Sequence, residues 1–187
     1  LKLKLTYLSP AKINLFLHVT SKRADGYHNL QTIFQLLNYC DEINIDYRID
    51  GVINRISGNE NIPQDQDLII RSATLLKQIT KSKGGADIGI VKKIPIGGGL
   101  GGGSSNAATV LIALNKLWSL NLSKVNLMDI SLNLGADVPL FINGHSSWGE
   151  GKGEILFPMP LPKYFYLVVS INKHISTVEV FAHKALT

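Results

Sequence analysis

The sequence predicts an α+β fold, because strand patterns and helix patterns are both present along the chain. Residues 1–7, 13–19 and 43–49 alternate apolar and polar side chains, which is typical of strands with one buried face. Residues 68–79 and 107–118 instead repeat apolar side chains every three or four positions, as amphipathic helices do. The chain has 187 residues, 45% of them hydrophobic, which is enough for a sizeable core.

Two successive half-buried strands are predicted at the start of the chain, over residues 1–7 and 13–19, with Pro10 between them. Lys12 and Asn14 would lie on the face opposite the apolar side chains of the second strand. A lysine in such a position is ordinarily a solvated surface residue. Taken alone, Lys12 therefore predicts no more than an exposed face.

A turn signal at Asp25-Gly26 precedes Tyr27 and His28, after which residues 33–37 predict another strand. Tyr27 and His28 would then lie at the end of a loop. Such a pair is often ordinary surface, but an aromatic ring beside a titratable donor can also stack on a base and read its edge. The local sequence leaves both interpretations open.

Two helices are predicted on either side of a glycine-rich run. The first has Asp67 as its N-cap and ends near residues 83–85, which read Lys-Gly-Gly. Ser104, Ser105 and Asn106 are the candidates for capping the second. The apolar face of the second helix consists of Ala107, Val110, Leu111, Leu114, Leu117 and Trp118.

The second half of the chain predicts three further elements. A helix capped by residues 121–123, which read Asn-Leu-Ser, should end at Gly135, and Asp137 follows it in a tight turn, where a turn or capping carboxylate is the ordinary interpretation. Residues 149–154 form a glycine-punctuated turn, and residues 164–171 are apolar enough for a buried strand. The apolar positions of the helix are Val125, Met128, Leu132 and Leu134.

The glycine-rich run from Pro95 to Ala108, PIGGGLGGGSSNAA, leads directly into the second predicted helix. Backbone N–H groups in the first turn of a helix lack intrahelical partners and carry the positive end of the helix dipole. Glycines let a phosphate approach the main chain, because no Cβ stands in the way. The run therefore predicts a binding site for a triphosphate.

Three other interpretations fit this run less well. A flexible linker would be flanked by polar sequence, whereas residues 88–96 are mostly apolar. Gly97, Gly99 and Gly102 satisfy the spacing of a dinucleotide-binding fingerprint, but residues 120–122 hold no acidic residue where that motif needs one. A Walker loop needs a lysine after its last glycine, and none follows here. A cation for the phosphates must come from elsewhere in the chain.

The composition argues against several classes of protein. The formal net charge is +5, but the basic residues are scattered, and the aromatic residues, 7% of the chain, are not interleaved with them as on a nucleic-acid-binding surface. Cys40 is the sole cysteine and the histidines show no ligand spacing, so neither a disulfide nor a protein-built metal site is predicted. The alternating start is unlike a signal peptide or membrane span. We expect a cytoplasmic protein without nucleic-acid or membrane partners, of open oligomeric state.

Three stretches together resemble the GHMP kinases, a family of small-molecule kinases. They are residues 10–28, which begin PAKINLFL and end RADGYH; residues 95–108; and residues 135–139, which read GADVP. The resemblance implies a two-layer fold like domain 2 of ribosomal protein S5. It places an N-terminal ATP-binding domain at residues 1–160 and the start of a truncated C-terminal, substrate-side domain at residues 161–187.

The resemblance further implies transfer of the ATP γ-phosphate to a hydroxyl of a cytidine-diphosphate sugar alcohol. Asp137 would be the carboxylate next to that hydroxyl, as base or as positioner, and Lys12 the cation beside it. Mg²⁺ would ride on the phosphates with few protein ligands. The residues expected to bind ATP are Pro95, Ile96, Gly97, Gly98, Gly99, Leu100, Gly101, Gly102, Gly103, Ser104, Ser105, Lys92, Asp67 and Leu68, and those expected to bind the substrate are Asn14, Tyr27, His28, Thr177 and Phe181.

Two alternatives stay open. A different GHMP kinase, such as a mevalonate or homoserine kinase, would act on another alcohol, although residues 25–28 argue against it. A catalytically silent nucleotide-binding protein is the other alternative, because the second half of the family and its His-Pro-Gly segment before Thr177 are not present in this sequence. Asp67 stands where the family usually has asparagine, and a carboxylate can only accept hydrogen bonds.

Overall fold

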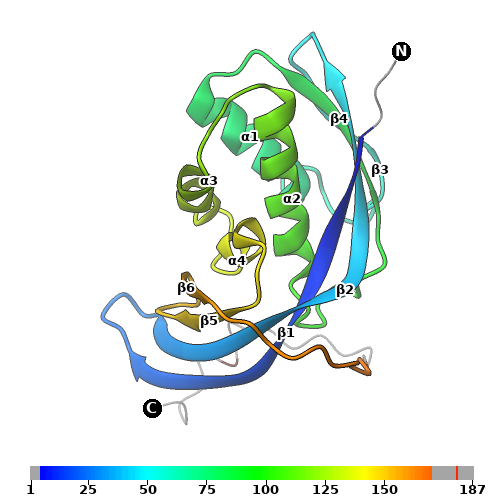
Figure 1. The fold of residues 1–187 in the computed structure, drawn as a ribbon. Helices are drawn as coiled ribbons and strands as arrows, with labels where there is room; N and C mark the ends of the chain where they lie inside the picture. The colour runs from blue at the N-terminus through cyan, green and yellow to red at the C-terminus, as the bar shows by residue number, and fades with distance from the viewer. Residues whose placement is uncertain (1–4, 170–179, 181–187) are drawn as a thin grey trace.

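The computed structural model describes residues 5–169 and residue 180. Within that range a curved six-stranded β-sheet has the helices packed on its concave side, which confirms the α+β fold with two layers (Figure 1). None of the helices described there has the length and hydropathy needed to cross a membrane. The elements are β1 (Leu5–Lys22), β2 (His28–Arg48), β3 (Ile53–Ser57), α1 (Leu68–Thr80), β4 (Gly85–Val91), α2 (Gly102–Leu117), α3 (Lys124–Ser131), α4 (Val138–Asn143), β5 (Ser147–Glu150) and β6 (Ile155–Pro158).

The long strand β2 organises the sheet. On one edge, β1 runs antiparallel to it along most of its length. On the other edge, β5 pairs with residues 32–34 and β4 with residues 42–48 of β2, both antiparallel. β3 lies parallel to β4, and β6 antiparallel to β5. The two pairings leave residues 35–41 between them, and the chain that leaves β4 hydrogen-bonds there to Asp41 on its way to α2.

The strands are longer than the sequence predicts. The two strands expected on either side of Pro10 form one strand, β1, and those expected at residues 33–37 and 43–49 are both parts of β2. Pro10 stays within β1 because the pairing register shifts between Pro10 and Lys12, and a proline without an N–H is tolerated at such an irregularity. Lys12 follows this shift and is only 6% exposed, so its interpretation as a surface residue is wrong.

The core lies between the sheet and the two long helices, α1 and α2. The predicted apolar face of α2 is confirmed, since Ala107, Val110, Leu111 and Leu114 are fully buried. They form one cluster with side chains of α1, β2 and β4. Complete burial of a large aliphatic side chain contributes about 1.5–3 kcal/mol to folding. The cluster therefore fixes α2 on the sheet, and with it the chain that enters α2.

Two of the predicted helix caps are confirmed. The Asp67 carboxylate accepts the N–H of Ile69 at 3.1 Å at the start of α1. The Ser123 hydroxyl accepts the N–H of Asn126 at 3.1 Å at the start of α3. Each cap satisfies an N–H group that has no acceptor within the helix, which is the reason these residue types are favoured there.

The caps predicted for α2 are wrong. The helix begins at Gly102, so Ser104, Ser105 and Asn106 lie within it and not in front of it. The N-cap is Gly101, which has a φ of 69° and makes no side-chain cap. The first turn of α2 is thus left without a capping side chain, and its N–H groups are available to an external acceptor.

Of the apolar positions predicted for the helix α3, Met128 and Leu134 pack against the core cluster and the other two do not. Val125 and Leu132 are 65% and 45% exposed, whereas Leu127 is buried. The helix also ends at Ser131 and not at Gly135. Because it has only eight residues, its side chains complete little more than two turns, and periodicity alone does not decide which of them meets the core.

The chain after β6 departs from another prediction. Residues 161–169 have no regular secondary structure, so the strand expected from residue 164 is absent as far as residue 169. Phe165 and Leu167 are 106% and 92% exposed, because no layer of the described part of the chain covers them. Thr177 and Phe181, both expected to bind the substrate, lie outside the described residues. The domain boundary at residue 160 stays a prediction.

Candidate functional site

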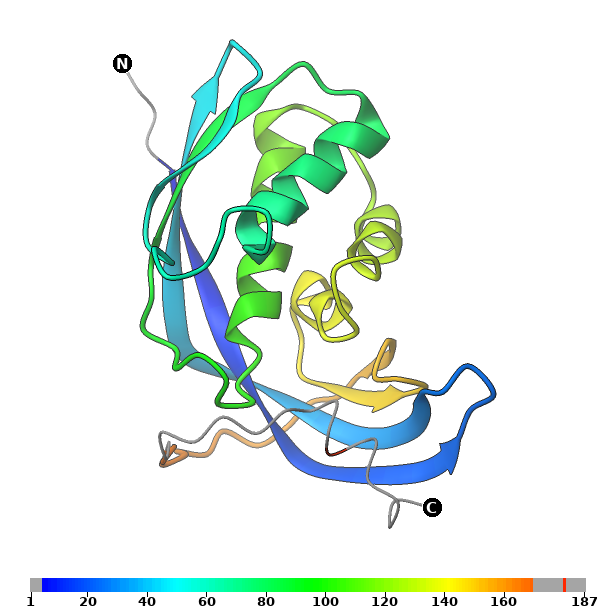
Figure 2. The ribbon, with the colours of Figure 1, turned by 180° about the vertical axis from the view of Figure 1, so that it is seen from behind.

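A cavity of about 980 Å³ lies where the chain between β4 and α2 meets the strands β1 and β2. Its walls come from segments far apart in the sequence, namely β1, the β1–β2 turn, β2, the chain from β3 to the start of α1, the entry to α2, the residues before α4 and the β5–β6 turn. Figure 2 shows the loop between β4 and α2 beside β1, where the sheet curves. We call residues 95–101 of this loop the glycine loop.

The buried side chain of Leu100 anchors the glycine loop to the strands. Leu100 is 6% exposed and packs in a small cluster with Ala11 and Ile94. The carbonyl of Leu100 also accepts the N–H of Lys12 in β1 at 2.9 Å. The loop is therefore attached to β1 by both its backbone and its side chain, while its glycines face the cavity.

Gly101 lets the loop turn into α2. Its φ of 69° lies in the left-handed region that favours glycine. A Cβ at this position would lie 2.8 Å from the ring of Phe141 and 3.0 Å from Cγ of Lys12, closer than such atoms pack. The close approach brings the first turn of α2 next to Lys12. The unpaired N–H groups of the first turn of α2 make it suited to binding phosphate.

A buried carboxylate ties the two ends of the glycine loop together. Asp41 of β2 is fully buried, and one of its oxygens accepts the N–H groups of Lys93 and Ile94 at 2.7 and 2.8 Å. The other oxygen accepts from Lys92 Nζ at 2.6 Å and Asn106 Nδ2 at 2.9 Å. Burial raises the pKa of Asp41, but these hydrogen bonds outweigh it, so the pKa lies below its usual value.

The same network continues into α2 and β1. Asn106 Nδ2 also donates to Ser9 Oγ at 2.9 Å, and Ser9 Oγ donates to Ser105 Oγ at 2.8 Å. Ser9 and Ser105 are fully buried, so the Ser105 side chain lies beneath the loop and does not line the cavity. Every polar group in this network has a partner, which is the condition for a buried polar cluster to stabilise a fold.

Lys92 brings to the glycine loop a cation that the loop itself lacks. Its ammonium group bonds to Asp41, lies 3.4 Å from Asn106 Oδ1, and would be 3.1 Å from a Cβ placed on Gly102. It therefore sits beside the first residue of α2. The family resemblance places Lys92 near the adenosine, and this position also puts its charge next to the N-terminus of α2.

Lys12 and Asp137 form an ion pair in the cavity wall. Lys12 Nζ lies 3.4 Å from Asp137 Oδ2. Asp137 stands at the N-cap position of α4, yet its side chain makes no capping hydrogen bond. The carboxylate is therefore not used as a helix cap, which was its ordinary interpretation from the sequence. Its side chain is 35% exposed and that of Lys12 is 8% exposed.

A chain of hydrogen bonds behind this pair fixes the Lys12 ammonium group. Thr32 Oγ1 donates to the carbonyl of Phe16 at 2.6 Å and accepts from Asn14 Nδ2 at 2.7 Å. The amide oxygen of Asn14 is thereby turned toward Lys12 Nζ, 2.6 Å away. Asn14 thus positions the cation, and it also lines the cavity, where the resemblance expects a substrate residue.

Tyr27, His28 and Lys152 form a second wall, which we call the acceptor wall. Tyr27 is 58% exposed, and His28 is 7% exposed. The N–H of Tyr27 donates to Asp25 at 3.1 Å, and Asp25 is ion-paired with Arg23, so the turn between β1 and β2 is internally bonded. Lys152 Nζ lies 4.6 Å from the centroid of the Tyr27 ring. The wall offers an aromatic face, an imidazole and an ammonium group.

The Asp67 carboxylate is engaged within the protein. It is 2% exposed, and Arg55 Nη1 donates to it at 2.7 Å. The N–H of Ile69 and the amide of Asn59 also donate to it. The carboxylate that replaces the usual asparagine is thus paired with an arginine. We expect a nucleotide contact here to come mainly from the neighbouring Leu68, which also lines the cavity.

The structure gathers most of the predicted site residues around this one cavity. Lys12, Asp137, Asn14, Tyr27, His28, Lys92, Asp67, Leu68 and residues 95–104 all line it. Sequence reasoning missed Asp41, Asn106 and Lys152. The turn that carries Lys152 was visible as a glycine-punctuated segment, whereas Asp41 has no local signal, because its partners lie far away in the sequence.

A metal ion would find few protein ligands here. Within the part of the chain that the structure describes, no three His, Cys, Asp or Glu side chains gather closely enough to hold one. Of the cavity residues, Asp67 and Asp137 carry carboxylates, and that of Asp67 is already engaged. This donor set suits a magnesium ion that takes most of its ligands from phosphates and water.

Part of the chain matches a known family of proteins. Residues 67–145 match the family model described as GHMP kinases N terminal domain. The matched range includes α1, the glycine loop, α2 and Asp137. Over this range the chain is similar to the GHMP kinases.

Relatives with curated names narrow the similarity within the GHMP kinases. The chain is 60% identical over 182 residues to the 4-diphosphocytidyl-2-C-methyl-D-erythritol kinase of Ruthia magnifica subsp. Calyptogena magnifica, covering 97% of this chain and 64% of the relative. A crystal structure of 4-(cytidine 5'-diphospho)-2C-methyl-D-erythritol kinase superposes with a TM-score of 0.74 at 38% identity, covering 84% of this chain and 56% of that one.

More distant structures share the fold of this chain. The mevalonate kinase of Methanococcus jannaschii superposes with a TM-score of 0.62 at 16% identity, covering 84% of this chain and 56% of that one. At this identity the similarity shows the fold alone. In each comparison the chain spans less than two thirds of the length of the protein it matches.

Proposed function

We propose that this chain is part of a kinase that transfers the γ-phosphate of ATP to the 2-hydroxyl of 4-diphosphocytidyl-2-C-methyl-D-erythritol, a step in the non-mevalonate (MEP) route to isoprenoid precursors. The relatives that carry this substrate in their names, at 60% and 38% identity, support the choice of acceptor. Kinases of mevalonate and homoserine match at only 16% identity, which supports the shared fold and not their substrates.

The observation that carries the proposal is the Lys12–Asp137 pair beside the glycine loop. Phosphoryl transfer passes through a loose transition state, so the protein must mainly align the hydroxyl with the γ-phosphate and neutralise charge. The carboxylate of Asp137, whose side chain is 35% exposed, can accept a hydrogen bond from the attacking hydroxyl, orient it and take its proton. Lys12, held by Asn14, can neutralise charge on the transferred phosphoryl group.

The glycine loop and the first turn of α2 would hold the phosphates of ATP. The N–H groups at the start of α2 have no helical acceptors, and Lys92 adds a positive charge beside Gly102. Magnesium bound to the phosphates would supply further charge neutralisation. The wall between Asp67 and Ile69 would then receive the adenosine, with Leu68 as its apolar contact.

The acceptor wall would bind the cytidine part of the acceptor. The exposed ring of Tyr27 offers a face on which a pyrimidine can stack. His28 lies next to it at the cavity wall and can hydrogen-bond the edge of the base. This arrangement supports a nucleotide-linked acceptor over a small free alcohol, because a small alcohol would leave the aromatic face unused.

ADP release by this chain from Mg-ATP tests the proposal. We expect release that depends on 4-diphosphocytidyl-2-C-methyl-D-erythritol and is not supported by mevalonate or homoserine. Release with mevalonate or homoserine would contradict the proposed acceptor. Binding of an ATP analogue without any release would favour the catalytically silent alternative. The same assay on a version extended to the length of the relatives separates a wrong acceptor from a missing segment.

The substitution Asp137→Asn tests the role of the carboxylate. An amide of the same size cannot take a proton from the hydroxyl, so we expect turnover to fall at least about 100-fold. Affinity for an ATP analogue should stay within a few-fold, because Asp137 does not belong to the glycine loop. Lys12→Ala should lower turnover in the same way by removing a charge at the phosphoryl group. Normal turnover by Asp137→Asn would refute the assigned role.

A further inference from the structure

The turn between β5 and β6 holds a lysine firmly against the cavity. Gly151 adopts a φ of 69°, and its carbonyl accepts the N–H of Leu30 in β2 at 2.7 Å. The N–H of Lys152 donates to a carboxylate oxygen of Glu154 at 2.5 Å. The backbone at Lys152 is thus fixed relative to β2. Its side chain extends toward Tyr27, and Nζ lies 4.6 Å from the centroid of the Tyr27 ring.

Lys152 differs from the other lysines of the cavity in its charge balance. Lys12 and Lys92 also line the cavity, and each is ion-paired with an aspartate. Among residues 5–169, Lys152 forms no ion pair, and its contact is an aromatic ring. Asp25 lies close enough to interact with it electrostatically but is itself paired with Arg23. The acceptor wall therefore presents a positive charge that no carboxylate of the described residues neutralises directly.

We propose that Lys152 is the residue that binds the diphosphate of the acceptor, and this inference rests on the proposed function above. A pyrimidine stacked on Tyr27 leaves its 5′-diphosphate a few bond lengths from the ring, within reach of a lysine anchored at the same ring. An ammonium group on a flexible four-carbon stem suits this role, because it can follow a phosphate oxygen as the acceptor settles.

The cation–π contact explains where the ammonium rests before the acceptor binds. The face of an aromatic ring attracts a cation weakly at an exposed site. A charge-assisted hydrogen bond to phosphate is stronger. An arriving base needs the Tyr27 face, and the ammonium released from it moves to the phosphates. Lys152 thus makes affinity depend on the phosphates of the acceptor, while Tyr27 and His28 recognise its base.

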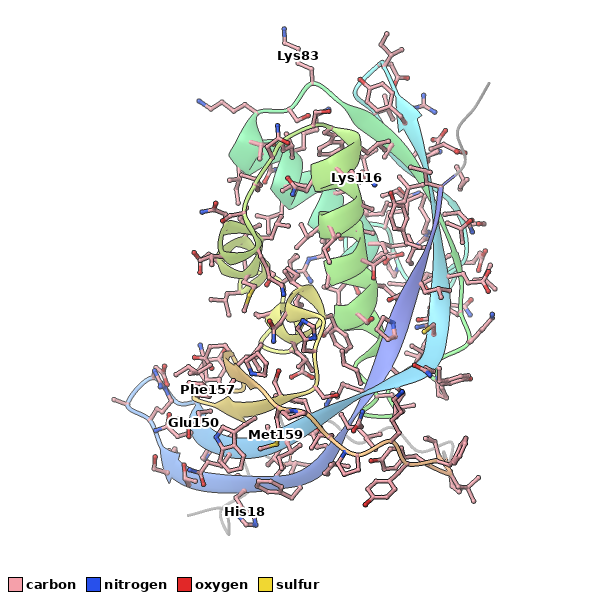
Figure 3. All side chains as sticks on the ribbon, viewed as in Figure 1. His18, Lys83, Lys116, Glu150, Phe157 and Met159 are labelled. Atoms are coloured by element: carbon pink, nitrogen blue, oxygen red, sulfur yellow. The ribbon has the colours of Figure 1, made fainter. Side chains whose placement is uncertain are left out.

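Binding of cytidine, CMP and CDP to the 187-residue chain, measured by calorimetry without divalent ions, tests this inference. Lys152→Met removes the charge and keeps an apolar stem beside Tyr27, whereas Lys152→Arg keeps the charge. Lys83→Met is the matched control, since Lys83 is exposed and points into solvent at the end of the molecule opposite Glu150, which leads into the turn (Figure 3). Affinity for an ATP analogue checks that each variant is folded.

We expect Lys152→Met to weaken CDP binding about ten- to a hundredfold and to leave cytidine binding within twofold. The salt dependence of CDP binding should also decrease, since one phosphate contact is lost. Lys152→Arg and Lys83→Met should bind CDP nearly as the unmodified chain does. If Lys152→Met lost affinity equally for cytidine and CDP, or lost none for CDP, this inference would be overturned and the proposed function would not be. Failure to bind any of the three ligands, by the unmodified chain and by a version extended to the length of the relatives, would overturn the proposed acceptor, and the inference with it.

Discussion

The wall of the cavity formed by the glycine loop rests on buried groups, whereas two of the three side chains of the acceptor wall, Tyr27 and Lys152, can be partly reached by solvent. Beneath the loop, Asp41 and Ser9 are fully buried and hydrogen-bonded, and Leu100 packs into a small apolar cluster. On the acceptor wall, Tyr27 is 58% exposed and Lys152 contacts its ring. The first wall is held in one shape, and the second can adjust its side chains.

This difference follows from how each wall would recognise its ligand. Backbone N–H groups bind phosphate only if the main chain already has the right shape, so the shape must be stabilised from beneath. Side chains such as Tyr27 and Lys152 would recognise a base and a phosphate by their own chemistry, and small movements would not abolish the contact. Substitutions beneath the loop should therefore affect stability and nucleotide binding together, while those on the acceptor wall should affect acceptor binding alone.

The largest effect should come from Asp41→Ala. The substitution leaves the Lys92 ammonium and the N–H groups of Lys93 and Ile94 without their acceptor. Breaking a buried ion pair by removing one partner costs about 3–5 kcal/mol, so we expect a loss of this size in the free energy of unfolding by urea. Asp129→Ala, at an exposed position of α3, is the control and should change stability by less than about 0.5 kcal/mol.

A loss below about 1 kcal/mol for Asp41→Ala would show that the loop does not depend on this carboxylate. The affinity for an ATP analogue gives a second measurement on the same protein. If stability falls but affinity in the remaining folded protein does not, the network stabilises the fold without shaping the phosphate site. The glycine loop and the acceptor wall would then differ in burial but not in how their shape affects ligand binding.

The next largest effect should be the difference in stability between two separate variants, Gly99→Ala and Gly101→Ala. Gly99 and Gly101 have φ values of 71° and 69°, so alanine at either position is strained by about 1–2 kcal/mol. A Cβ at Gly99 would meet nothing within 4 Å, whereas at Gly101 it would press on Phe141 and Lys12. We expect Gly101→Ala to lose about 1–3 kcal/mol more than Gly99→Ala in urea unfolding, and to reduce turnover further by displacing Lys12.

Equal losses for the two glycine variants would mean that Phe141 and Lys12 move aside without cost. That outcome would contradict the rigid shape assigned to the loop. A larger loss of stability for Gly99→Ala would instead mean that Gly99 contacts another part of the chain, which the structure does not show.

Much of the fold could be predicted because its signals are local. The spacing of Ala107, Val110, Leu111 and Leu114 identifies the buried face of α2, and Asp67 is recognisable as a cap from its neighbours. The length of β1 was not predictable in the same way, because Pro10 ordinarily ends a strand and is accommodated here by a register shift. Whether a shift occurs depends on the partner strand, which local sequence does not specify.

The candidate site also has one part with a local sequence signal and another part that depends on the tertiary structure. The glycine-rich run predicts a phosphate site from chain geometry alone. The polar network beneath it joins Ser9, Asp41, Lys92 and Asn106, which come from four separate segments and meet only in the folded chain. Lys152 approaches Tyr27 for a similar reason, since β5 and β2 pair across a long stretch of sequence. Residues of this kind need the tertiary structure before their chemistry can be recognised.

The smallest predicted effect is a difference at low pH between the contributions of Asp41 and Asp25 to the stability of the fold. Burial acts against ionisation of both, but hydrogen bonds keep the pKa of Asp41 and that of Asp25 below the usual value. A folded-state pKa below that of the unfolded chain adds stability above the unfolded value, about 3.9 for aspartate, and this stability is lost as the pH falls through the folded value. Asp25 is exposed at the turn, so its effect is screened by solvent and should be negligible.

Urea unfolding of Asp41→Asn and Asp25→Asn between pH 6 and pH 3, expressed relative to the unmodified chain, measures this difference. The stability gap between Asp41→Asn and the unmodified chain should be constant near neutral pH and narrow as the pH falls below about 4, because protonation removes the same charge that the substitution removes. Asp25→Asn should show no such trend. A gap for Asp41→Asn that stays constant to pH 3 would mean that the pKa of Asp41 is the same in the folded and the unfolded chain, which would contradict the lowered pKa.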